Sequence, residues 1–168
     1  AGNLLLSTGA IISILPAPTG FSYPTLSAWL PNNMVNAFAL SGDTLYLGGS
    51  FTSLIEPSSY TGYGVLLSTT NSTISPNFPF INGIVYTAAP DGNGGLYIGG
   101  YFSKVGPQSR TNIARINADG TLHPWNPSVN STVTAIYVTS NTVYIGGNFS
   151  SAGGQSRNRL AALSATSG

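Results

Sequence analysis

Apolar and polar residues alternate over short runs along most of this chain, and glycine, asparagine, aspartate and proline separate the runs. Valine, isoleucine, tyrosine and threonine fill the runs, which is typical of half-buried strands. No window combines the apolar spacing of an amphipathic helix with helix caps. The pattern therefore predicts an all-β protein of short strands and tight turns.

One motif, apolar-Tyr-apolar-Gly-Gly-x-Phe, recurs along the chain. Its copies are Leu45–Phe51, Leu96–Phe102 and Val143–Phe149, which begin 51 and 47 residues apart. Similar strand-like segments precede and follow each copy, so each unit reads as four short strands. Four strands in roughly 50 residues is the size of a propeller blade. The predicted fold is β-propeller-type blades, about three four-stranded repeats, in an incomplete propeller or one completed between subunits.

The repeat divides the chain into four parts. Repeat 1 spans residues 35–84, repeat 2 spans 85–132, and repeat 3 spans 133–168 and lacks a fourth strand. Residues 1–34 read as N-terminal strands, a partial blade with an insertion that could be exchanged between subunits.

The glycines and phenylalanine of the motif are predicted to be structural. Two glycines at a strand end allow a bulge, or a close approach between blades that a Cβ would block. The phenylalanine is expected to pack between blades. These residues are Gly48, Gly49, Phe51, Gly99, Gly100, Phe102, Gly146, Gly147 and Phe149.

Two stretches resemble a known repeat family. They run from Tyr97 to Gly120 and from Tyr144 to Leu163, and each contains Tyr-Ile-Gly-Gly-x-Phe-Ser followed by Gln-Ser-Arg. This string is similar to the delta-60 family of β-propeller repeats. The first copy departs from it, with Glu56–Tyr63 in place of the Gln-Ser-Arg region. The resemblance implies a propeller in a secreted or surface protein, and no shared activity.

About three blades leave open flanks, because closed propellers have roughly four to eight blades and unpaired edges promote association. Three solutions are open: a longer propeller, a dimer that forms a six-bladed ring, or an N-terminal strand that pairs with the last blade in the same or a neighbouring chain. A head-to-tail contact that does not close gives a filament. The candidate assembly strand comprises Leu4, Leu5, Leu6, Ile11, Ile12, Ile14 and Leu15.

Charge is scarce: charged residues are 5% of the chain and the net charge is +1. Nucleic-acid binding is therefore not expected, because it needs clustered Lys and Arg. Membrane insertion is not expected either, since no segment has the roughly 18 apolar residues of a spanning helix. A weakly charged surface rich in Asn, Ser, Thr and Tyr lacks the repulsion that keeps soluble proteins apart. It suits a secreted or cell-surface assembly.

Candidate chemistry is sparse. His123 is the one histidine, and repeat 1 has Ser75 at that position. Cysteine is absent, which excludes thiolate nucleophiles and thiolate zinc sites. Asp43, Asp91 and Asp119 fall in turns, so they do not read as a facing pair of catalytic carboxylates. We therefore expect no enzyme activity, no metal site and no cofactor.

Some residues remain as contact candidates. Tyr60 and Tyr63 lie in the aromatic loop that departs most from the repeat, and Arg110 and Arg157 share one repeat position. Asparagine-linked glycosylation motifs occur at Asn71, Asn130 and Asn148.

The leading functional hypothesis is a non-catalytic structural subunit of an extracellular assembly, such as a filament, sheath or surface layer. Its expected partners are copies of itself or the remainder of a longer chain. The alternative is a glycan- or protein-binding propeller module of a larger secreted adhesin, in which exposed tyrosines would contact the ligand.

Overall fold

The computed structural model describes residues 4–5, 11–12, 31–54, 59–71 and 73–168. At residues 4–5, 11–12 and 59–60 it describes the backbone alone.

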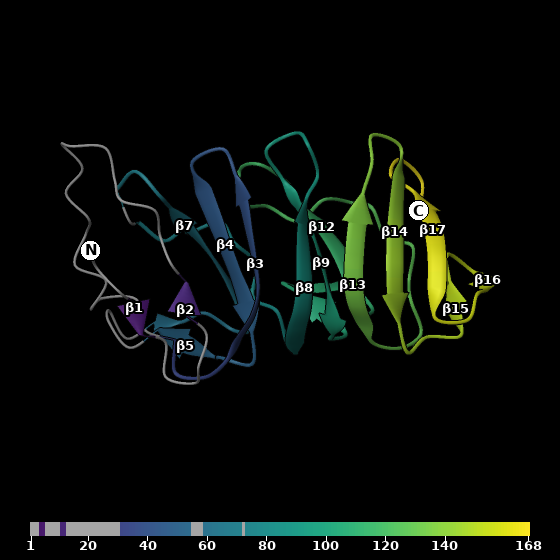
Figure 1. Ribbon diagram of the computed structural model, residues 1–168, viewed down its shortest axis with the longest axis horizontal. Coiled ribbons are helices and arrows are strands. Elements are labelled where there is room, and N and C mark those ends of the chain that lie inside the picture. The colour runs from purple at the N-terminus through teal and green to yellow at the C-terminus, as the bar shows by residue number, and fades with distance from the viewer. Residues whose placement is uncertain (1–3, 6–10, 13–30, 55–58, 72) are drawn as a thin grey trace.

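Three antiparallel sheets of three strands stand side by side (Figure 1). We call them blades 1, 2 and 3. Each is a simple meander in which the second strand is central. The strands are β3 (Val35–Ser41), β4 (Thr44–Gly49) and β7 (Gly64–Ser68) in blade 1; β8 (Ile84–Pro90), β9 (Leu96–Tyr101) and β12 (Ile113–Ile116) in blade 2; and β13 (Val133–Val138), β14 (Thr142–Gly147) and β17 (Leu160–Ser164) in blade 3.

The predicted fourth strand is reduced to a single bridge. Ile74 pairs with Leu67 in blade 1, and Leu122 pairs with Ile116 in blade 2. Proline follows two residues later in both segments, at Pro76 and Pro124, and the missing N–H of proline cannot extend a ladder. Among the described residues after β17, none makes such a bridge.

A short hairpin that the alternation pattern did not predict joins the second and third strands of each blade. Its two-residue strands are β5 (Ser53–Leu54) and β6 (Ser59–Tyr60), β10 (Lys104–Val105) and β11 (Gln108–Ser109), and β15 (Ser151–Ala152) and β16 (Gln155–Ser156).

The N-terminal strands pair with each other. β1 (Leu4–Leu5) and β2 (Ile11–Ile12) form an antiparallel pair, while Leu6, Ile14 and Leu15 lie outside the described residues. The exchange of this segment between subunits stays a prediction.

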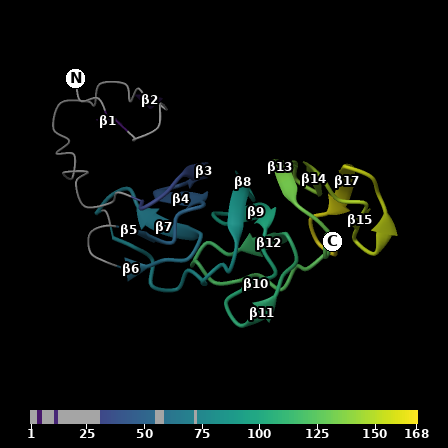
Figure 2. The same cartoon turned by 90° about the horizontal axis from the view of Figure 1, so that it is seen from below.

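The blades meet through their first strands and faces. β3 contacts β8, and β8 contacts β13. Figure 2 shows the three sheets following one another along an arc. One apolar cluster joins blade 1 to blade 2 and another joins blade 2 to blade 3. The described sheets do not close into a ring, so the fold is all-β, with β-propeller-type blades and two open ends.

The second glycine of each motif lies at a bulge. The register of β8 shifts by one residue opposite Gly100, and a Cβ there would meet the carbonyl oxygen of Ile84. Gly49 and Gly147 face equivalent carbonyls in the other blades. A side chain at this position is excluded by the blade's own backbone. The motif phenylalanines Phe51, Phe102 and Phe149 are all buried.

Replacing Tyr46 with phenylalanine is expected to stabilise the protein. The Tyr46 side chain is fully buried, and its hydroxyl has no hydrogen-bond partner among the described residues. Burial raises the pKa of this hydroxyl far above its ordinary value. Removing an unsatisfied buried polar group should raise the free energy of unfolding by about 1 kcal/mol. Denaturant unfolding measures the change.

Tyr144→Phe is the matched control, because Tyr144 holds the same motif position but is exposed. Its free energy of unfolding should change by less than about 0.5 kcal/mol. Equal effects at the two sites would contradict the prediction.

Candidate functional site

Each blade has a forward face, which turns toward the next blade along the chain, and a backward face on its other side. The forward face of blade 2 is the surface that packs against blade 3. Tyr97 and Ile113 are 1% and 0% exposed there. A Cβ on Gly99 would lie 2.7 Å from the Val133 Cγ1 of blade 3. The first glycine of the motif therefore makes the space that a valine of the next blade fills.

The junction between blades 1 and 2 repeats this arrangement. Tyr46 is 0% exposed, and a Cβ on Gly48 would lie 2.8 Å from the Val85 Cγ1. An aromatic ring from the fourth segment completes each junction: Phe78 lies 5.6 Å from Tyr46, and Trp125 lies 5.0 Å edge-on from Tyr97. The junctions are thus built to one plan.

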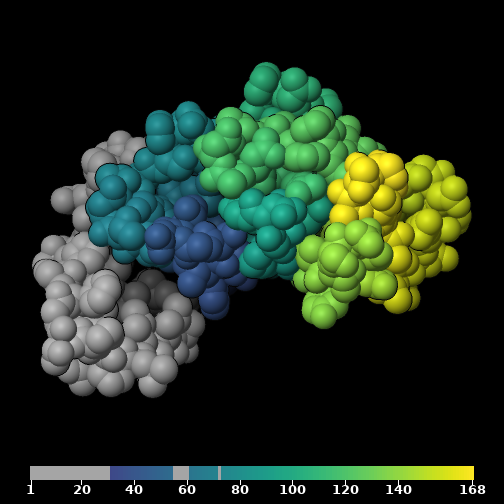
Figure 3. All heavy atoms as spheres, turned by 90° about the horizontal axis from the view of Figure 1, so that it is seen from above, coloured from purple at the N-terminus to yellow at the C-terminus, as the bar shows by residue number. Residues whose placement is uncertain are grey.

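The forward face of blade 3 has the same motif tyrosine and glycine, with Leu160 in the place of Ile113, but is uncovered. Tyr144 and Leu160 are 42% and 69% exposed. A Cβ on Gly146 would find its nearest neighbour, the Ala135 Cβ of its own blade, 3.6 Å away. In Figure 3 the light-green to yellow atoms of blade 3 form one end of the row of blades. An apolar face of the kind buried inside the protein is therefore exposed at this end.

The backward face of blade 1 is the second open surface. Phe38 and Leu40 are 64% and 57% exposed on β3. Alternate residues of that strand, Ala37 and Ala39, are buried on the opposite side against blade 2. Both ends of the row of blades thus present exposed apolar side chains.

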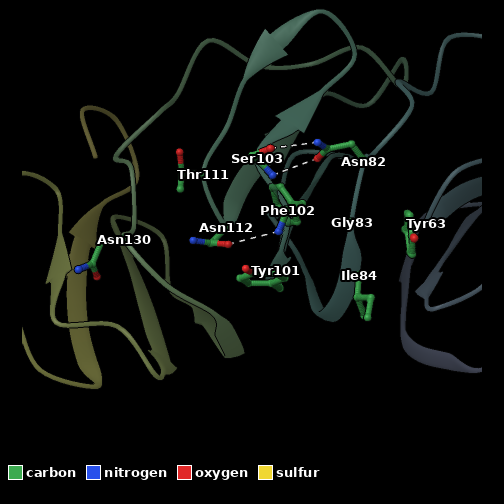
Figure 4. Close-up of a pocket in the computed structure, with 10 residues that line it drawn as sticks. All are labelled: Tyr63, Asn82, Gly83, Ile84, Tyr101, Phe102, Ser103, Thr111, Asn112 and Asn130. Carbon is green, nitrogen blue, oxygen red and sulfur yellow. Dashed lines mark hydrogen bonds between the residues drawn. The ribbon is translucent and has the colours of Figure 1, made fainter.

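A hollow of about 480 Å³ opens at one edge of the blades (Figure 4). Its lining includes Tyr63 of blade 1, Tyr101 of blade 2, and Thr111. The Tyr101 side chain is exposed. Tyrosine combines an apolar ring with a polar hydroxyl, which is why it is common at binding surfaces.

The asparagines of the hollow already hold the fold together. The Asn82 Oδ1 accepts hydrogen bonds from the Ser103 and Lys104 amides. Asn112, which is buried, accepts from the Phe102 amide and donates to the Val129 carbonyl. With these amide groups engaged, the side chains that the hollow offers a ligand include Tyr63, Tyr101 and Thr111.

Asp91 and Arg115 form the ion pair of blade 2. The Arg115 Nε and Nη2 donate to the Asp91 Oδ2 at 3.0 and 2.7 Å, and the Arg115 and Asp91 side chains are 16% and 3% exposed, respectively. The Asp91 Oδ1 accepts from the Asn93 and Gly95 amides, which fixes the hairpin turn. The Arg115 guanidinium also lies 5.3 Å from the centre of the Tyr97 ring. The carboxylate is fully engaged in structure.

His123 accepts a hydrogen bond at Nδ1 from the Trp125 amide, at 3.0 Å. Burial lowers the pKa of His123, the positive charges of Arg115 and Arg110 lower it further, and Asp91 partly opposes them. Its imidazole is thus held in the neutral form that anchors the Trp125 segment.

Stability should therefore fall as the pH drops below about 6.5, the ordinary pKa of histidine. Because the folded pKa lies below the unfolded one, the unfolded chain binds more protons in this window, and protonation favours unfolding. The loss should grow until the pH reaches the folded pKa. Thermal melts between pH 7 and pH 5 measure it.

His123→Asn is the control, because an amide oxygen can replace the Nδ1 acceptor but does not titrate. Its melting temperature should fall less over the same range. Identical pH profiles for the two proteins would refute the role of His123.

The two repeated arginines bind carbonyl groups. Arg110 is buried and donates to the Ser109 and His123 carbonyls, and burial lowers its pKa. Arg157 donates to the Ala162 carbonyl on β17. In blade 2 the equivalent carbonyl, that of Arg115, accepts from the His123 amide of the fourth segment. Arg157 thus takes the place of a fourth-segment amide in blade 3.

Two of the three glycosylation candidates, Asn71 and Asn130, are engaged in hydrogen bonds. Asn71 and Asn148 are exposed, and the Asn71 Oδ1 accepts from the Thr73 hydroxyl. Asn130 donates to the Ser150 hydroxyl and accepts from two backbone amides, so a glycan there would have to leave the one N–H that bonds to Ser150 in place. The Tyr60 side chain lies outside the described residues.

In the described part of the chain, no group of three or more His, Cys, Asp or Glu side chains could hold a metal ion. Nor do the described residues include a helix long and apolar enough to cross a membrane.

Comparison with known proteins supports the repeat class. Residues 91–124 and 140–165 match the family model described as "Domain of unknown function (DUF5122) beta-propeller". No curated protein sequence matches the chain. A solved structure described as "Crystal structure of the computationally designed Ika4 protein" is similar at 11% identity and a TM-score of 0.38, over 79% of this chain and 92% of that one. A TM-score this low does not establish that the two proteins share a fold.

The blades and the family match together define a β-propeller-type repeat protein. The match supports this wider class, while the delta-60 type stays a prediction from the residues quoted above.

Proposed function

We propose that this chain is a non-catalytic structural subunit of an extracellular assembly, such as a filament, sheath or surface layer. One observation carries the proposal: the motif tyrosine is 0% and 1% exposed at the two internal junctions but 42% exposed on blade 3. A face of the type that is buried at the internal junctions is thus exposed on blade 3, and contact with another copy or with the remainder of a longer chain would bury it. The low charge, 5% of residues, leaves little repulsion to oppose association.

Negative-stain microscopy and mass determination on natively isolated material test this function. Fibres or sheets of identical subunits in the extracellular fraction are expected. A monomer of 17.3 kDa in that material would contradict the proposal, as would recovery of the protein from the cytosol alone.

A second candidate is a glycan-binding module, which the hollow beside Tyr63 and Tyr101 favours. Glycan-array binding that is lost in both Tyr63→Ala and Tyr101→Ala, with folding unchanged, would support it. Intact binding by these variants, or none by the parent protein, would count against it.

A further inference from the structure

We propose that the forward face of blade 3 binds the backward face of blade 1 of a second copy, so that copies of this chain join head to tail. The inference rests on the proposed assembly function and specifies its joint. The internal junctions provide the template for the contact.

Two side chains of blade 3 carry the contact to blade 2. The Val133 Cγ1 and the Ile136 Cδ1 would lie 2.7 and 3.0 Å from a Cβ on Gly99, so both fill the space over this glycine. Val133 is fully buried there. We call a blade that packs on a forward face in this way a donor blade, and it must present two such apolar side chains.

Blade 1 presents the same two positions. Val35 pairs with the second glycine of its motif, Gly49, as Val133 pairs with Gly147. Phe38 pairs with Leu47, and Ile136 pairs with Ile145, at equivalent places in the next strand. Val35 is partly buried, and Phe38 is 64% exposed. Blade 1 therefore has an apolar donor surface of the type that blade 3 uses.

The forward face of blade 3 is the matching surface for such a donor blade, and we call it the acceptor. Gly146 leaves free the space that Val133 fills over Gly99, because a Cβ on Gly146 would have no neighbour closer than 3.6 Å. Leu160 occupies the place of Ile113: each pairs with the first glycine of its motif. Leu160 is 69% exposed, whereas Ile113 is 0% exposed. A blade that covered this face as blade 3 covers blade 2 would bury the Leu160 side chain, which is now exposed to water.

A second copy fits this face better than an unrelated partner, because the contact of a valine with the first motif glycine recurs at both internal junctions. Phe38 and Leu160 also hold the places that Ile136 and Ile113 hold at the junction of blades 2 and 3. Neither surface carries a charged residue at the positions named, so like-charge repulsion does not oppose the contact. The two surfaces are different parts of the chain, so the joint is heterologous and leads to rings or filaments.

Two exposed positions allow each side of the joint to be blocked without disturbing the core. Leu160→Lys blocks the forward face, and Phe38→Lys blocks the backward face. The parent protein should associate as its concentration rises in sedimentation-velocity experiments, and each variant alone should stay monomeric. An equimolar mixture should form a 1:1 dimer, twice the 17.3 kDa chain mass, because each variant keeps one intact face. Tyr86→Lys changes an exposed residue of blade 2, which is on neither face, and should associate like the parent.

The outcomes that contradict the joint also separate it from the wider function. If both variants associate as the parent does, the joint is wrong and assembly uses another surface. If the parent stays monomeric at every concentration, both the joint and the assembly function are overturned. If the variants are monomeric but their mixture forms no dimer, the head-to-tail polarity is wrong. Circular dichroism establishes that each variant is folded.

Discussion

Asp91→Ala should be among the most destabilising single substitutions in the protein, with a loss of about 3–5 kcal/mol in the free energy of unfolding. The change leaves the Arg115 guanidinium, whose side chain is only 16% exposed, without its carboxylate. It also removes the acceptor of the Asn93 and Gly95 amides at the turn. Chemical denaturation measures the loss directly.

Two further variants separate these causes. Asp91→Asn can keep an oxygen for the turn amides but not the charge for Arg115. The double variant Asp91→Ala with Arg115→Leu removes the unpaired cation and places leucine where blade 1 has Leu66. It should recover part of the stability, as replacement of buried ion pairs by apolar residues often does.

Asp43→Ala is the surface control. Asp43 lies in the equivalent turn of blade 1 and is exposed. Its loss should change the free energy of unfolding by less than about 0.5 kcal/mol. If Asp91→Ala costs no more than this, the Asp91–Arg115 pair contributes nothing measurable.

The fold class could be predicted from the sequence because the period of the repeat and the alternation within strands both reflect burial. The fourth strand was predicted too long, because Leu122 and its neighbours match the strand pattern although Pro124 ends the ladder. The hairpin β10–β11 was missed because its strands have two residues each and no alternation. Gly106, which has a φ of +57° at the turn of this hairpin, could have indicated it in the sequence, because glycine is favoured in such turns.

The candidate site was less accessible to sequence reasoning. Pairing of Asp91 with Arg115 spans 24 residues and has no counterpart in blade 1, so the repeat could not indicate it. The exposed end faces and the buried junction faces are formed by residues at equivalent positions of the repeat. Tyr46, Tyr97 and Tyr144 look alike in sequence and differ only in what lies next to them. A repeat therefore identifies the residues of a junction but not whether that junction is occupied.

Alanine at the first glycine of the motif should have opposite effects in blades 2 and 3. A Cβ on Gly99 would lie 2.7 Å from the Val133 Cγ1 and 2.9 Å from the Thr87 Cγ2. Overpacking of this kind costs about 1–3 kcal/mol. Gly146 has ordinary van der Waals room, and alanine there should stabilise the monomer by about 0.4–1 kcal/mol by restricting the unfolded chain. Denaturant unfolding of both variants under monomeric conditions measures the contrast.

The same pair of substitutions connects stability to assembly. Gly146→Ala adds a methyl group where the proposed joint places Val35 of the next copy, so it should weaken association while it stabilises the isolated chain. A general folding defect cannot produce this combination, because it would lower both quantities together. If Gly146→Ala instead destabilises the monomer as Gly99→Ala does, the space over Gly146 is already filled within one chain. The forward face of blade 3 would then have no room for a partner.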